Sequence, residues 1–64
     1  MNVKNFLNTY FKEWAITQIG TSPDVGYIIL RHGETKIKIK MRMNGAKHWT
    51  SNEVSIIDIV GVDE

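Results

Sequence analysis

The sequence predicts a small α+β domain, in which an N-terminal amphipathic helix packs on an antiparallel sheet of three to four strands. Three observations lead to this prediction. Apolar residues recur every three or four positions near the N-terminus, apolar and cationic residues alternate over residues 36–43, and an Asn-Gly pair follows that alternation. A small SH3-like or OB-like barrel is the alternative, because short strands joined by tight turns are able to close on themselves. Residues 1–64 form one predicted domain, since no linker or repeat interrupts them.

The chain is short and contains no cysteine. A domain of this size buries only about 60% of the surface that its unfolded chain exposes, so it depends on good packing or on a partner chain. Disulfides are excluded, and His32 and His48 alone do not make a structural zinc site. Neither a signal peptide nor an apolar run of about 18 residues is visible. The sequence therefore predicts a cytoplasmic protein without a metal or cofactor.

The N-terminal segment has the periodicity of a helix, and Asn2 is suited to cap its start. One alternative extends this helix to Ile19, with Gly20 as its C-cap. The other ends the helix near Trp14 and makes residues 15–19 a short strand, which the β-branched residues of that segment favour. The apolar side of the helix consists of Val3, Phe6, Leu7, Tyr10, Phe11 and Trp14.

Turn residues divide the rest of the chain into strands. Gly33 is expected to supply a positive φ in a hairpin turn, and Asn44-Gly45 is the strongest short hairpin signal. The last strand is apolar on both faces apart from Ser55 and Asp58, which predicts a central position and a buried, paired carboxylate at Asp58. The predicted strands are residues 25–31, 35–43, 46–50 and 54–62.

Charge is unevenly distributed, although the net charge is only +1. Residues 31–48 hold six lysines and arginines against one glutamate, whereas residues 49–64 hold four carboxylates and no cation. In residues 36–43 the cations occupy every second position, so they project from one face of a strand at intervals of about 7 Å. This segregation indicates a polyanionic partner, or an acidic C-terminal stretch that covers the basic face.

Two-residue turns on both sides of the cationic strand predict which residues share its face. The first turn places Ile28 and Leu30 beside Ile37 and Ile39, which leaves Tyr27 on the basic side. The second turn places Trp49 there too. Aromatic rings for stacking and cations for phosphates are the components of a platform for single-stranded nucleic acid. The candidate site, for nucleic acid or for an acidic partner, is Tyr27, Lys36, Lys38, Lys40, Arg42, Lys47 and Trp49.

A purely structural interpretation of this face competes with the functional one. Lysines on strands protect sheets against aggregation, and the stem of Lys38 is able to lie across Tyr27. A bulge at Asn44-Gly45 would turn Trp49 into the core.

The reactive side chains form no constellation typical of catalysis, so the sequence predicts no enzyme. His32 lies in a turn, and His48 is expected to face the core as a structural histidine.

Three classes of function are compatible with the pattern. They are a nucleic-acid-binding module, a small regulator or inhibitor of the phage or mobile-element type that binds a host protein by its basic face or a sheet edge, and a structural homo-oligomer such as a homodimer. No membrane association is expected, since the cations lie on a strand and not on an amphipathic helix.

Overall fold

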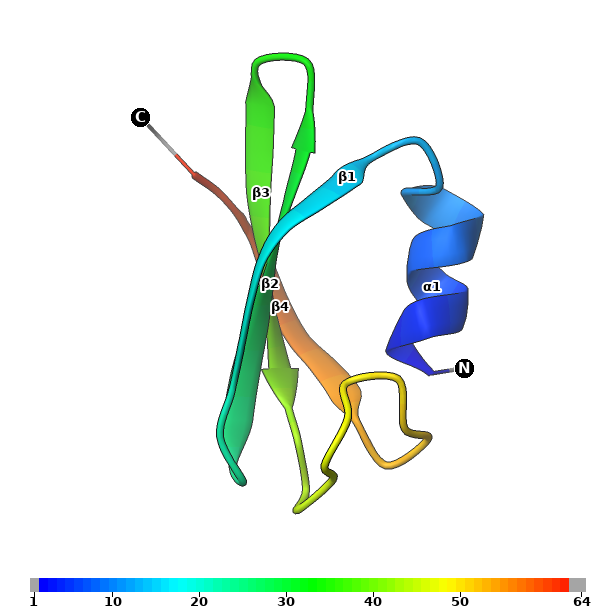
Figure 1. Ribbon diagram of the computed structural model, residues 1–64, viewed down its shortest axis with the longest axis vertical. Helices are drawn as coiled ribbons and strands as arrows, with labels where there is room; N and C mark the ends of the chain where they lie inside the picture. The colour runs from blue at the N-terminus through cyan, green and yellow to red at the C-terminus, as the bar shows by residue number, and fades with distance from the viewer. Residues whose placement is uncertain (1, 63–64) are drawn as a thin grey trace.

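The computed structural model describes residues 2–62 and contains one short helix and an antiparallel sheet with the strand order β1-β2-β3-β4. Each strand pairs with its neighbour in the sequence, so the sheet is an open meander with β1 and β4 at its edges (Figure 1). The α+β class is confirmed, and the barrel alternative is wrong because the sheet does not close. The elements are α1 (Val3–Tyr10), β1 (Ala15–Thr21), β2 (Val25–His32), β3 (Thr35–Arg42) and β4 (Ser55–Gly61).

Helix α1 is shorter than the apolar periodicity predicts. Asn2 caps it as expected, because its side chain accepts a hydrogen bond from the Asn5 backbone N–H at 2.9 Å. Phe11 is the C-cap, and residues 15–21 form strand β1, which confirms the strand alternative. Only Val3 and Leu7 of the helix are buried. These two residues are four positions apart, so they lie on the same face of α1, one turn after the other.

The β2–β3 hairpin has the predicted register. Ile28 lies opposite Ile39 and Leu30 lies opposite Ile37, while His32 pairs with Thr35 at the turn. Gly33 occupies the left-handed region with φ 62°, a conformation that glycine adopts without steric cost. Because paired residues share a face of the sheet, this register places Ile28, Leu30, Ile37 and Ile39 on the face opposite to the β3 cations.

The Asn44-Gly45 turn forms, but the strand predicted at residues 46–50 does not. Asn44 and Gly45 both have positive φ, 53° and 78°, and the Ala46 N–H donates to the Met43 carbonyl at 2.9 Å. The place beside β3 is nevertheless taken by β4, in which Ser55 pairs with Arg42 and Gly61 with Ile37. The longer, apolar β4 occupies the free edge of β3, and the intervening residues form a loop that packs near α1 (Figure 1).

Strand β4 is an edge strand, which corrects the predicted central position. Its pairing with β3 is irregular between Lys40 and Met41, so that Ile57 is an extra residue on the β4 side. Asp58 is exposed and its carboxylate accepts from the Ile59 N–H at 2.9 Å; the predicted buried carboxylate is therefore wrong. An edge position leaves one side of the strand to water, which removes the need for a buried partner.

The hydrophobic core lies between one face of the sheet, α1 and the loop that precedes β4. Side chains of β2 and β3 supply four of its eight buried residues, and Trp14, Phe11 and Trp49 pack around it in partly buried positions. Two hydrogen bonds from the Asn2 side-chain amide, to the Thr50 carbonyl and the Asn52 side chain, tie the start of α1 to this loop. The buried residues are Val3, Leu7, Ile28, Leu30, Ile39, Met41, Met43 and Val54.

Candidate functional site

The face of the sheet opposite to the hydrophobic core, which we call the outer face, is composed of two cross-strand rows of four residues and two rows of three. In the first row Gly20, Tyr27, Lys40 and Asp58 lie next to one another on the four strands. The adjacent rows, defined by the same pairings, are Gln18, Ile29, Lys38 and Val60 on one side and Val25, Arg42 and Ser55 on the other. Beyond Lys38 the last row contains Ala15, Arg31 and Lys36.

The structure brings most of the predicted site residues together. Tyr27 on β2 lies among the β3 cations, all of which project from the outer face as the alternation predicts. Arg31 joins them opposite Lys36, and its Nε donates to the Gly33 carbonyl at 2.8 Å. Asp58, opposite Lys40, is the carboxylate that the described strand pairings place on this face. The predicted residues that share the outer face are Tyr27, Lys36, Lys38, Lys40 and Arg42.

Lys47 and Trp49 are not part of this face, which corrects the prediction for both. They lie in the loop between β3 and β4, where Lys47 is exposed and Trp49 is half-buried against the core. His48, predicted to face the core, is exposed. The prediction failed because it assumed that the Asn44-Gly45 turn starts a paired strand, and without that pairing alternate residues do not share the β3 faces.

Tyr27 is held by three neighbours. A Cβ atom placed on Gly20 would lie 2.3 Å from Tyr27 Cε1, so the ring occupies the space that a side chain at position 20 would need. The Gln18 Nε2 donates to the Tyr27 hydroxyl at 2.8 Å. Lys38 Nζ lies 4.8 Å from the ring centroid, as a cation–π contact, which confirms that Lys38 extends toward Tyr27.

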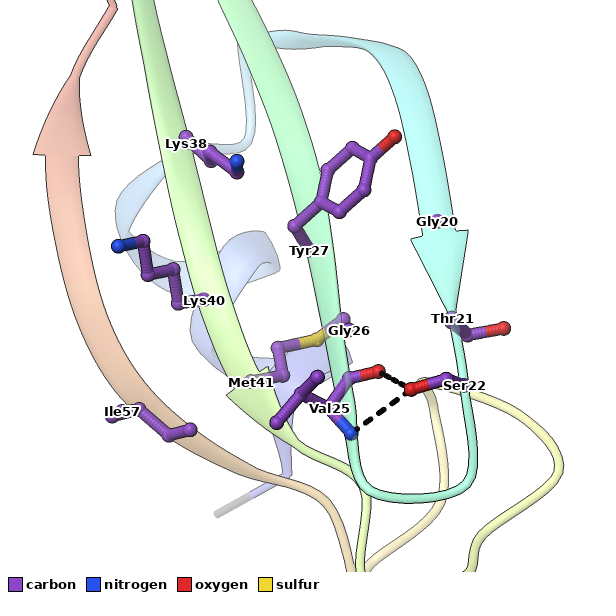
Figure 2. A pocket seen from close by; sticks show the side chains of 10 residues that line it. All are labelled: Gly20, Thr21, Ser22, Val25, Gly26, Tyr27, Lys38, Lys40, Met41 and Ile57. Carbon is purple, nitrogen blue, oxygen red and sulfur yellow. Dashed lines mark hydrogen bonds between the residues drawn. The ribbon is translucent and has the colours of Figure 1, made fainter.

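A groove of about 410 Å³ runs along the outer face beside Tyr27, and we call it the Tyr27 groove. Figure 2 shows the Lys38 ammonium group turned toward the tyrosine ring and the Lys40 side chain turned toward β4. The apolar walls come from Val25 and Ile57, which are 56% and 50% exposed. The turn before β2 is stabilised by the Ser22 hydroxyl, which donates to the Val25 carbonyl at 2.8 Å. The groove thus combines two cations, one aromatic ring and apolar walls.

Sequence reasoning missed Gly20, Gln18 and Ile57 as parts of this site. Glycine inside a β-branched segment is a known signal for the close approach of another group, so Gly20 was recognisable in principle. The position of Ile57 depends on the irregular β3–β4 pairing, for which the sequence contains no turn or glycine signal.

His32 and Glu53 lie apart from the outer face. His32 ends β2 and its ring centroid is 5.3 Å from that of Trp14, an arrangement that serves packing. Within residues 2–62, no three His, Asp or Glu side chains group closely enough to hold a metal ion. Hydrogen bonds from the Ser51 hydroxyl and the backbone lower the pKa of Glu53, in the loop before β4.

Comparison with known proteins identifies no relative: no protein-family model, curated protein or solved structure matches this chain. None of the helices formed by residues 2–62 has the length and hydropathy needed to cross a membrane.

Proposed function

We propose that this protein is a non-enzymatic binding module that holds single-stranded nucleic acid on its outer face. The observation that carries the proposal is the common placement of Tyr27 with Lys38, Lys40 and Arg42 on the sheet face that the hydrophobic core leaves free. A sheet face of this composition offers a ring for stacking and cations for phosphates, and it needs no enclosed pocket.

The spacing of the cations suits an extended polyanion. Lys38, Lys40 and Arg42 follow one another at every second residue of β3, which corresponds to about 7 Å between neighbours. A strand of nucleic acid repeats its phosphates at a similar interval. Each lysine that neutralises a phosphate releases condensed counterions, so the affinity is expected to fall as the salt concentration rises.

Stacking on Tyr27 competes with the contact from Lys38. An exposed cation–π contact is worth about 0.5–1 kcal/mol, whereas a base stacked on an aromatic side chain contributes about 1–3 kcal/mol. The flexible stem of Lys38 is therefore expected to give way to a base, and its ammonium group then becomes available to a phosphate. The half-buried Tyr27 ring stays in position because Gly20 and Gln18 support it.

A second candidate function is the binding of an acidic protein, as a small regulator or inhibitor of the phage or mobile-element type would do. The exposed Val25 and Ile57 beside the lysines favour it, because an acidic amphipathic peptide presents both charges and apolar side chains. This candidate predicts dependence on the lysines and on Ile57, but a weaker dependence on Tyr27.

The test is a fluorescence-anisotropy titration of labelled oligothymidine and of a duplex, at low and moderate salt. Replacing Lys38 and Lys40 together by Gln should lower the slope of log affinity against log salt by roughly 1.4, from about 0.7 per lost phosphate contact. Tyr27→Ala should cost about 1–3 kcal/mol of binding free energy. The matched control is the double variant of Lys4 and Lys12 to Gln, which removes the same charge from the exposed side of the N-terminal segment.

Equal loss in both double variants would mean that net charge alone governs binding and would contradict a site on the outer face. Binding of an acidic amphipathic peptide by a parent protein that does not bind oligothymidine at low salt would replace the proposal by the second candidate.

A further inference from the structure

The Tyr27 groove has features that a simple cationic surface does not need. Its volume, about 410 Å³, falls within the range of pockets that hold one small ligand. Its walls are mainly apolar, and its two cations, Lys38 and Lys40, both come from β3, between Tyr27 on β2 and Ile57 on β4. Cations alone would bind a polyanion through its charged backbone. The apolar walls would in addition contact a flat, weakly polar group that is attached to the anion.

We propose that the Tyr27 groove is a nucleotide subsite, in which one base lies against Tyr27 between Val25 and Ile57 while Lys38 and Lys40 hold the adjoining phosphates. The inference rests on the proposed function, because it assigns one nucleotide of the bound strand to a defined place on the outer face. A base provides the planar apolar body, and its phosphates provide the charge that the two lysines complement.

Gly20 makes this subsite possible. The Tyr27 ring lies where a side chain of residue 20 would stand, since a Cβ there would approach Cε1 to 2.3 Å and the hydroxyl oxygen to 2.9 Å. An alanine at this position would push the ring away from β1 and into the groove. Gly61, in the opposite edge strand, has no atom within 4 Å of such a Cβ and therefore serves as a matched glycine.

Gly20→Ala therefore changes the position of the Tyr27 ring, on which the base is proposed to stack, without changing the charge of the protein. We expect Gly20→Ala to weaken the binding of oligothymidine by about fivefold to a hundredfold, the range that corresponds to loss of one stacked base. The salt dependence should stay that of the parent, because the lysines remain. Gly61→Ala should bind like the parent.

The decisive experiment varies the protein at position 20 and the presence of bases in the ligand, separately and together. Oligothymidine and an abasic strand of the same length are titrated by anisotropy against the parent, Gly20→Ala and Gly61→Ala proteins. If a base occupies the groove, the parent and Gly61→Ala prefer oligothymidine to the abasic strand, and Gly20→Ala loses that preference. Equal preference in the parent and Gly20→Ala would overturn the subsite, although binding of both strands would leave the proposed function standing.

Two further measurements separate folding from binding. Comparing the melting temperatures of Gly20→Ala and Gly61→Ala shows whether the substitution in β1 disturbs folding. Ile57→Thr alters the opposite wall of the groove at an exposed position, and it should reduce the preference for oligothymidine over the abasic strand. If no strand binds at all, the proposed function fails, and thymidine monophosphate is titrated into the ¹⁵N-labelled parent. Shifts confined to the amides around Gly20, Tyr27 and Lys38 would then retain the subsite, whereas their absence would overturn it.

Discussion

Tyr27 is held in place by its neighbours, which distinguishes it from an ordinary exposed tyrosine. The missing side chain at Gly20 makes room for the ring, Gln18 bonds its hydroxyl, and Lys38 covers part of it. A ring with a fixed orientation loses less conformational entropy when a ligand stacks on it. At the scale of residues, the absence of one Cβ atom is therefore as important to the outer face as the presence of the lysines.

Trp49 provides a prediction that separates stability from binding. Because its half-buried ring packs against the core, Trp49→Ala should lower the free energy of unfolding by about 2–3 kcal/mol, somewhat less than a fully buried aromatic residue. Urea denaturation measures this cost, and anisotropy below the unfolding transition measures the affinity of the folded protein for oligothymidine. The affinity should match that of the parent, and a large loss of affinity without loss of stability would return Trp49 to the binding site.

Glu53 gives a pH-dependent prediction. Its pKa is lowered chiefly by the hydrogen bond from Ser51, so the folded state binds the proton less readily than the unfolded state. The resulting stabilisation is present at neutral pH and is lost as the pH falls through the lowered pKa. Ser51→Ala should raise the pKa of Glu53 toward its ordinary value, as followed by NMR titration of its side-chain carboxyl carbon. An unchanged pKa would show that the serine hydroxyl does not donate to this carboxylate in solution.

At the scale of elements, α1 depends on a small contact with the rest of the molecule. An isolated helix of eight residues is unstable in water, so the burial of Val3 and Leu7 and the bonds made by Asn2 have to hold it. The sheet is held differently, because each of its three strand pairs forms a long antiparallel ladder. The helix is therefore expected to be the element whose attachment is most sensitive to a single substitution.

Leu7→Ala tests this dependence. Removing a side chain that is only 6% exposed should cost about 2–4 kcal/mol of unfolding free energy. The exposed Asn8 of the same helix offers the control, and Asn8→Ala should change the stability by no more than about 0.5 kcal/mol. Both values follow from urea denaturation. Similar small effects for both variants would show that α1 does not pack on the sheet in solution.

At the scale of the whole molecule, charge and hydrophobicity are divided between the two faces of one sheet. The core lies on one face, and Arg31, Lys36, Lys38, Lys40 and Arg42 gather on the other. Such a gathering of like charge attracts a polyanion, and it also repels itself in the absence of a partner. Binding and stability should consequently respond to salt in opposite directions.

The expected result is that sodium chloride raises the melting temperature while it weakens nucleic-acid binding. Cations about 7 Å apart lie within the Debye length of about 10 Å at 0.1 M salt, so higher salt screens their repulsion. Relief of about 0.5–1 kcal/mol corresponds to roughly 2–8 °C in a domain of this size. The response should shrink in the Lys38 and Lys40 double variant and persist in the Lys4 and Lys12 double variant. A melting temperature that falls with salt would contradict net repulsion on the outer face.

The acidic C-terminal stretch, residues 49–64, is the second segment of the molecule with a one-sided charge. The charge pattern leaves two roles open for it besides a polyanionic partner of the basic face, namely covering that face or meeting the basic strand of a second copy, and Asp63 and Glu64 lie outside the described residues. Of its other members, Glu53 lies in the loop before β4 and Asp58 lies opposite Lys40. A homo-oligomer remains a proposal, which a concentration-dependent molar mass in sedimentation would support.

The local sequence determined the features that depend on short-range geometry. Strict alternation placed the β3 cations on one face, Gly33 set the turn that aligns Ile28 with Ile39, and Asn44-Gly45 formed its turn. Each of these follows from backbone preferences within a few residues or from the two-residue period of a strand.

Competition between distant segments decided the rest. A turn formed by Asn44-Gly45 does not determine which segment pairs with β3, because the local preference for a hairpin is smaller than the gain from pairing the longer, apolar β4. That choice placed Trp49 half-buried against the core, made β4 an edge strand and exposed Asp58. The Tyr27 groove likewise requires Gly20, Tyr27 and Ile57 from three strands, and only the tertiary structure brings residues so far apart in the sequence onto one surface.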